Sequence, residues 1–174
     1  MGAHQLCFAL DLVDGARPEP TARAATQGPV AAHLAKAGSR PPDTIWRANP
    51  RLQGLVGLTD AIGWFGAHGY TVSVPLVDAQ PYDLVVDGPD GLQRVQVKTT
   101  TYRTRSGVFA VQLATRGGNR SYHTMKRFDS STSDLLYVLT DARERYLIPT
   151  SAVTAGALLS LGSKVAAYRV AAAK

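Results

Sequence analysis

Two short apolar segments separated by a dense turn signal decide the fold of this chain. Residues 82–99 read YDLVVDGPDGLQRVQVKT, and residues 82–87 and 92–99 carry the β-branched and apolar side chains typical of strands. Between them, GPDG at residues 88–91 is a turn sequence. We therefore predict a hairpin in which residue 87 faces residue 92 across a four-residue loop.

The register of this hairpin brings three polar side chains together. Asp83 falls opposite Gln96, and directly paired residues share a face of the sheet. Lys98 follows Gln96 by two residues and so lies on the same face. A carboxylate and an amide oxygen are hard ligands suited to Mg²⁺, and a nearby lysine can orient or deprotonate an attacking water or neutralise phosphate charge. Spacing alone leaves open that the three residues only form a solvent-exposed strand face.

The other segments indicate one helix followed by a series of strands. Apolar residues at positions 55, 58, 62 and 65 form a helical stripe, and Gly69 is a natural end for that helix. Further strands are expected at residues 70–77, 108–113, 135–140, 145–148 and 165–170, with a short helix at 151–161. We predict an α/β fold of the mixed α+β type, with the helix covering one sheet face.

The first 50 residues differ from the rest of the chain. They hold six of its ten prolines and are rich in Ala and Gly, which predicts a loosely structured arm with a short helix at 26–37. The compact domain is expected at residues 51–174. The single cysteine, Cys7, excludes an internal disulfide and indicates a reduced, cytoplasmic protein. No apolar stretch is suited to crossing a membrane.

Positive charge is concentrated in one part of the sequence. The net charge is +6, and seven Lys and Arg residues lie between residues 98 and 130, opposed there only by Asp129. Such a basic stripe is the electrostatic pattern expected for a phosphate-rich partner. Charge alone also allows a solvated basic face.

At these residues the sequence resembles a known family. Residues 57–61 (GLTDA), 69–70 (GY), 74–76 (VPL), 82–87 (YDLVVD) and 95–100 (VQVKTT) are similar to the PD-(D/E)XK nucleases. The similarity is greatest to the group I intron-associated endonucleases and their free-standing bacterial relatives, and it runs from about residue 54 to residue 170. It implies a restriction-endonuclease-like core with a mixed β-sheet flanked by helices. It also implies metal-dependent endonucleolytic cleavage of DNA by homodimers or homotetramers that cut both strands.

The resemblance assigns roles to four residues. Asp83 would be the metal-binding acid, Gln96 the second metal ligand and Lys98 the catalytic lysine. Asp60, on the preceding helix, would complete the metal site in place of the usual Glu, although a helix-surface carboxylate is the alternative. The expected ion is Mg²⁺, for which Mn²⁺ can substitute. Gln96 replaces the commoner Asp or Glu, which removes one negative charge and lowers the expected metal affinity.

Residues after this group fit contacts with DNA, because hydroxyl and Arg side chains commonly bind phosphates. The expected contacts are Thr99, Thr100, Arg103, Arg105, Arg116, Arg120, Lys126 and Arg127. Two other functions stay open. The neutral Gln96 also fits a DNA-binding module of the same fold that no longer cuts, and the basic stripe also fits a domain that binds an acidic protein.

Overall fold

The computed structural model describes residues 49–77, 79–116 and 125–171, and all of them belong to one compact unit, Arg40–Lys174. The predicted arm lies almost entirely outside the described residues, and so do the helix expected at 26–37 and the proposed DNA contact Arg120. Within the described part of the chain, no helix is long and apolar enough to cross a membrane.

The long helix α3 (Pro50–Ala67) begins and ends at residues that favour such boundaries. The Asn49 side chain accepts a hydrogen bond from the Arg51 N–H at 2.9 Å, and Pro50 occupies the first turn, where its missing N–H costs nothing. Beyond the helix, Gly69 has a φ of 82°, a left-handed conformation that glycine adopts readily. The predicted helix end at Gly69 is confirmed.

The buried face of α3 differs from the predicted stripe. Gly57, Ala61, Trp64 and Phe65 are buried, whereas Leu55 is 53% exposed. A β-carbon added at Gly57 would overlap the methyl group of Thr99 in the sheet. At Gly57 the helix therefore lies so close to the sheet that a larger residue would require a shift. The other residues of the predicted stripe do face the core, because Phe65 is buried and Leu58 and Ile62 pack against it.

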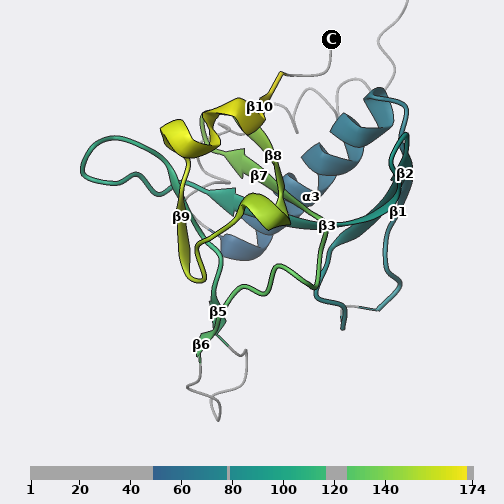
Figure 1. The fold of residues 1–174 in the computed structure, drawn as a ribbon, viewed down its shortest axis with the longest axis horizontal. Coiled ribbons are helices and arrows are strands. Elements are labelled where there is room, and N and C mark those ends of the chain that lie inside the picture. Colours follow the sequence, from purple (N-terminus) through teal and green to yellow (C-terminus); the bar gives the residue numbers. More distant parts are fainter. Residues whose placement is uncertain (1–48, 78, 117–124, 172–174) are drawn as a thin grey trace, which may run out of the picture. The chain divides into compact units, whose positions relative to one another are not determined.

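A mixed six-stranded sheet forms the centre of the fold (Figure 1). Its strand order is β1-β2-β3-β7-β8-β10, and its neighbours pair antiparallel except for β3 and β7, which are parallel. The strands are β1 (Thr71–Ser73), β2 (Leu84–Gly88), β3 (Gly91–Thr100), β7 (Leu135–Thr140), β8 (Arg145–Pro149) and β10 (Arg169–Val170). The predicted mixed α+β fold is confirmed, and the parallel pair shows that the strands do not follow one simple meander.

Each face of the sheet has its own apolar core. Helix α3 packs on one face, where Phe65 meets Leu84, Val95 and Tyr137. The other face carries Leu136, Val138 and Ile148. It is covered by the strand pair β4 (Ala110–Gln112) and β9 (Leu158–Ser160) and by the 3-10 helices η1 (Thr150–Ala152) and η2 (Ser163–Tyr168). A short ribbon of β5 (Thr115–Arg116) and β6 (Met125–Lys126) extends away from the sheet (Figure 1).

Three predicted elements differ from the structure in extent or type. The strand expected at 70–77 ends at Ser73, because Pro75 lacks the N–H that a sheet ladder needs. The helix expected at 151–161 is η1 followed by β9, where Leu159 is buried between two exposed neighbours, the two-residue period of a strand. The strand expected at 165–170 is mostly η2, with only β10 at its end.

Candidate active site

The hairpin register that places the candidate residues is confirmed. Leu84 pairs with Val95 and Asp87 with Leu92, as predicted. Gly88 pairs with Gly91, so the connecting loop is shorter than expected, but the register is unchanged. Leu84 and Val95 belong to the core under α3, so Gln96 turns to the opposite face of the sheet, whereas Asp83 lies in a bend before β2, at the edge of the sheet.

Asp83 lies just before β2, at the edge of β3. Its backbone N–H donates to the Val95 carbonyl at 2.9 Å, and its Oδ2 accepts a hydrogen bond from the Val97 N–H at 2.6 Å. The Asp83 carboxylate thus bonds to the β3 backbone at the position where a longer β2 would have paired with it. The N–H and C=O of one strand residue point to the same side of the strand. The Val97 carbonyl therefore points to this edge as a further oxygen donor.

Gln96 and Asp83 line the same pocket, which has a volume of about 230 Å³. The Gln96 Oε1 atom is buried and has no hydrogen-bond partner among the described residues. Buried polar atoms of native proteins nearly always have a partner, so this acceptor is available to a water molecule or a cation in the pocket.

A second wall of this polar pocket is formed by residues of the β5–β6 ribbon and of the segment that follows it. Lys126, Arg127 and Asp129 line it, together with Thr115 and Thr132. This wall is tied to the protein, because the Phe128 N–H donates to the Gly156 carbonyl at 2.9 Å and the Thr132 hydroxyl donates to the Asp129 carbonyl at 2.8 Å. Two cationic residues, Lys126 and Arg127, thus line the same small cavity as the two oxygen ligands.

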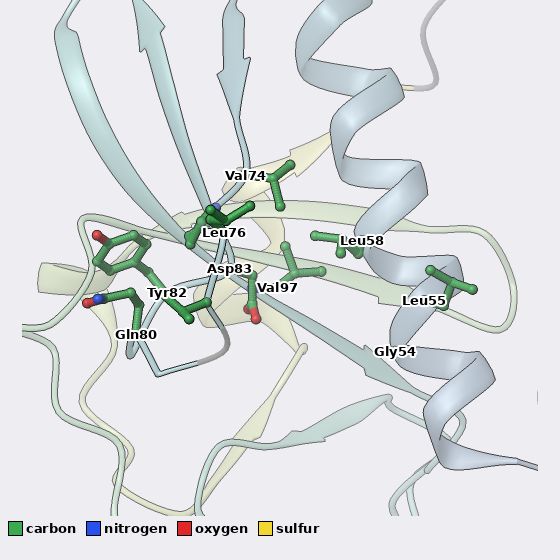
Figure 2. A pocket seen from close by; sticks show the side chains of 11 residues that line it. Gly54, Leu55, Leu58, Val74, Leu76, Gln80, Tyr82, Asp83 and Val97 are labelled. Atoms are coloured by element: carbon green, nitrogen blue, oxygen red, sulfur yellow. The ribbon is translucent and has the colours of Figure 1, made fainter.

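A larger pocket of about 470 Å³ adjoins Asp83 on the helix side of the sheet. Figure 2 shows Leu55 and Leu58 of α3 on one side of it, Asp83 and Val97 in the middle, and Gln80 and Tyr82 on the far side. Its walls are mostly apolar, so the smaller pocket is the one with the chemistry of a phosphate or metal site.

Lys98 lies on β3 two residues after Gln96, on the same face of the sheet by strand alternation. It is half-buried and is not among the described residues that line the polar pocket. Asp83 and Gln96 therefore line one cavity. Lys98 lies on β3, two residues after Gln96, next to the part of the strand that lines this cavity.

Asp60 is engaged elsewhere. Its Oδ1 accepts from the Tyr137 hydroxyl at 2.7 Å, and its two oxygens accept from the Arg145 guanidinium at 2.7 and 2.6 Å. Burial acts to raise the pKa of Asp60, but the hydrogen bonds from Arg145 and Tyr137 outweigh it and hold the pKa below its ordinary value. Tyr137 belongs to β7 and Arg145 to β8, whereas Asp83 lies at the opposite edge of β3. Asp60 is not among the residues that line the polar pocket or the larger pocket beside Asp83.

The expected DNA contacts occupy different environments. The Thr99 methyl group faces Gly57, and the buried Thr100 hydroxyl donates to the Ala110 carbonyl. Arg103 lies over the Phe109 ring at 3.5 Å and donates to the Gly107 carbonyl at 3.0 Å. These two contacts hold the Arg103 side chain against its own loop, and Arg105 in the same loop is exposed. Arg116 lies on β5, next to the wall that carries Lys126 and Arg127. The Thr100 hydroxyl is committed to the protein interior, which disfavours it as a DNA contact.

The polar pocket fits a hydrated divalent cation that is held together with a substrate. Asp83 supplies a carboxylate, Gln96 an unpartnered amide oxygen and Val97 a carbonyl directed to the same edge. The described residues contain no cluster of three or more His, Cys, Asp or Glu side chains suited to a metal. Mg²⁺ sites commonly use one or two carboxylates plus substrate phosphates. This donor set fits such a site and predicts weak metal binding without DNA.

Comparison with known proteins identifies the class of protein that this fold and site define. The sequence profile of the PD-(D/E)XK endonucleases matches residues 48–167, and the chain belongs to that family. Among solved structures, the bacterial homing endonuclease I-Ssp6803I is similar, with a TM-score of 0.62 and 23% sequence identity over 70% of this chain and 89% of that chain. This similarity shows the shared fold. No curated protein gives a significant match.

The sequence alone did not reveal the full lining of the pocket. Thr115 on β5, and Asp129 and Thr132 after β6, join it only because the tertiary fold brings these segments to Gln96 of β3. The Val97 carbonyl could not be identified from the sequence, because every residue has a backbone carbonyl. The charge concentration was the available signal for Lys126 and Arg127, but it did not separate these residues from other cations of the basic stripe.

Proposed function

We propose that this protein is a divalent-metal-dependent DNA endonuclease with its active site in the pocket between Asp83, Gln96 and Arg127. The observation that supports this most is the buried, unpartnered Gln96 oxygen beside the Asp83 carboxylate in a member of an endonuclease family. Asp83 and Gln96 would hold Mg²⁺ or Mn²⁺. The ion, when bound, would polarise the phosphate and make a bound water more acidic.

The roles of the other residues follow from their positions. Lys98, beside the pocket on β3, would orient the attacking water or accept its proton. Lys126, Arg127 and the exposed Arg105 would bind the DNA backbone. Asp60 remains a predicted ligand, but its use would require Arg145 to release it. Assembly as a homodimer or homotetramer and a cytoplasmic location stay predictions from the sequence.

The test begins with a library of DNA duplexes of random central sequence, from which cleaved ends are sequenced in Mg²⁺ or Mn²⁺. Plasmid and branched DNA are assayed in parallel. We expect cleavage by the parent and at least a roughly 100-fold loss in Asp83→Asn and in Lys98→Ala, the scale of a lost general acid–base group. Asp87→Asn, at the far end of the same strand, is the matched control and should cleave normally. A parent that cuts no substrate with either ion would contradict the proposal.

A DNA-binding module that no longer cuts is the second candidate. The neutral Gln96 and the engagement of Asp60 by Arg145 favour it. The two functions differ in how DNA binding responds to Ca²⁺, which supports binding by nucleases but not cleavage. A nuclease should bind DNA more tightly in Ca²⁺ and lose this gain in Asp83→Asn. A mere binder should show the same affinity in both proteins, with and without the ion.

A further inference from the structure

The cations of the basic stripe are not equivalent, and Arg127 occupies a special place among them. It lines the polar pocket together with Asp83 and Gln96, whereas Arg103 is engaged by Phe109 and Arg105 lies on a separate loop. In the described part of the chain no carboxylate forms an ion pair with Arg127. Its charge is therefore available to an anion that enters the pocket.

The stem of Arg127 is held in place by the protein. A β-carbon added at Gly156 would lie 3.5 Å from the Arg127 Cδ, so the stem runs over the bare backbone of that glycine. The next residue, Phe128, donates its N–H to the Gly156 carbonyl at 2.9 Å and packs against the core under β4 and β9. An arginine with an anchored stem loses less freedom when it binds a ligand than one on a mobile loop.

Lys126 lines the same pocket but has a different charge environment. Hydrogen bonds from Ser131, reinforced by the nearby charge of Lys126, hold the pKa of Asp129 below its ordinary value, so Asp129 is ionised at neutral pH. The Asp129 Oδ1 accepts from the Ser131 N–H at 2.9 Å and from its hydroxyl at 2.7 Å. Asp129 thus offsets part of the Lys126 charge and leaves Arg127 as the stronger anion-binding group.

We propose that Arg127 contacts the non-bridging oxygens of the phosphate that is cleaved, and stabilises the charge that develops there. This inference rests on the proposed endonuclease function. In hydrolysis the water oxygen bonds to phosphorus and loses a proton, while the bond to one ester oxygen breaks and that oxygen gains a proton. The negative charge that develops on the non-bridging oxygens would lie between the metal ligands Asp83 and Gln96 and the guanidinium of Arg127. A planar guanidinium suits two such oxygens at once.

The test compares Arg127→Ala and Arg127→Lys with Lys164→Ala, a change at an exposed cation on η2 that lies outside the pocket and outside the basic segment. Cleavage rates are measured at saturating enzyme on a duplex obtained from the random library, and DNA affinity is measured in Ca²⁺. We expect Arg127→Ala to lower the saturated rate about 100-fold or more, the scale of a lost transition-state donor, and Arg127→Lys to restore part of it. Lys164→Ala should leave both the DNA affinity and the saturated rate unchanged.

A binding measurement separates direct contact from a structural role. The phosphate at the mapped cleavage position is replaced by a neutral methylphosphonate, and affinity is measured in Ca²⁺. The replacement should weaken binding by the parent and by Lys164→Ala, but much less by Arg127→Ala. Arg127→Met, which keeps the stem over Gly156, serves if the alanine variant does not fold. Equal saturated rates for the parent and the Arg127 variants, or equal sensitivity to the replacement, would overturn the inference. A parent that never cleaves would instead overturn the proposed function.

Discussion

At the scale of single residues, the neutral Gln96 sets the charge of the proposed metal site. The Gln96 Oε1 atom is buried and has no hydrogen-bond partner among the described residues, and Gln96 lines the polar pocket together with Asp83. We predict that Gln96→Glu destabilises the metal-free protein by about 1–3 kcal/mol, because it places a charge among buried groups without a partner. The same variant should bind Mn²⁺ more tightly than the parent, since ligand charge raises affinity. Thermal unfolding in EDTA and in Mn²⁺, with calorimetric titration, measures both effects.

Gln93→Glu is the matched control for this variant. It makes the same change three residues earlier on β3, on the helix side of the strand. It should not alter Mn²⁺ affinity. If Gln96→Glu bound Mn²⁺ no better than Gln93→Glu did, Gln96 would not be a metal ligand.

The Asp60–Arg145 pair makes a second prediction, about pH. Because the pKa of Asp60 is lowered in the folded protein, the pair stabilises the fold above the unfolded-state pKa of about 3.9 and loses this effect as the pH falls through the lower folded value. Asp60→Asn should cost about 1–3 kcal/mol at pH 7, the scale of hydrogen bonds to charged groups. It should also lose less stability than the parent between pH 5 and pH 2, as measured by urea unfolding.

The exposed turn residue Asp90 provides the control for this pH series. Asp90→Asn should follow the parent at every pH. The series also bears on catalysis, because a purely structural Asp60 would leave metal affinity unchanged in the folded variant. A large loss of Mn²⁺ binding in Asp60→Asn would support the family-based assignment of Asp60 as a ligand.

At the scale of elements, the contact between α3 and β3 depends on one glycine. A β-carbon at Gly57 would overlap the Thr99 methyl group and approach the Val97 Cγ1 at 3.4 Å. We predict that Gly57→Ala destabilises the protein by about 1–3 kcal/mol through overpacking, although alanine favours helices by about 1 kcal/mol over glycine. Chemical denaturation measures the change.

Two further variants identify the cause. Gly63→Ala lies in the same helix with open space around it, and it should stabilise the protein by about 0.5–1 kcal/mol through helix propensity alone. Thr99→Ser removes the overlapping methyl group and should recover much of the loss in Gly57→Ala. If both glycine variants were stabilising, the close approach of α3 to β3 would be wrong.

Local elements were predictable from the sequence, whereas elements set by distant contacts were not. The β2–β3 register follows from one turn between two strands, and the β7–β8 hairpin is equally local. The parallel pairing of β3 with β7 joins segments about 40 residues apart and has no local signal. Likewise, β9 is a strand because it pairs with β4, although its sequence also allows a helix. The same limit explains the site, where Asp83 and Gln96 were predictable together and the wall around Arg127 was not.

At the scale of the whole molecule, charge and fold predict how the protein meets DNA. The net charge of +6 is concentrated in the segment that contains Arg105, Lys126 and Arg127. Each phosphate contact contributes about −0.9 to the slope of log affinity against log salt. We predict that Arg105→Gln and Lys126→Gln each reduce the steepness of this slope by about 1. Lys164→Gln, on η2 outside the basic segment, should leave it unchanged. Fluorescence anisotropy in Ca²⁺ over a salt series gives the slopes.

The same titrations distinguish DNA from an acidic protein as the partner. Both kinds of binding weaken with salt, so the slope of the parent alone does not separate them. A DNA-binding site that includes the Asp83 pocket should respond to Ca²⁺ and should prefer duplex DNA over heparin at equal concentration of negative charge. An acidic-protein site has no reason to prefer the spacing of DNA phosphates or to involve Asp83. Stronger competition by heparin, together with no effect of Ca²⁺ or of Asp83→Asn, would favour the acidic-protein partner.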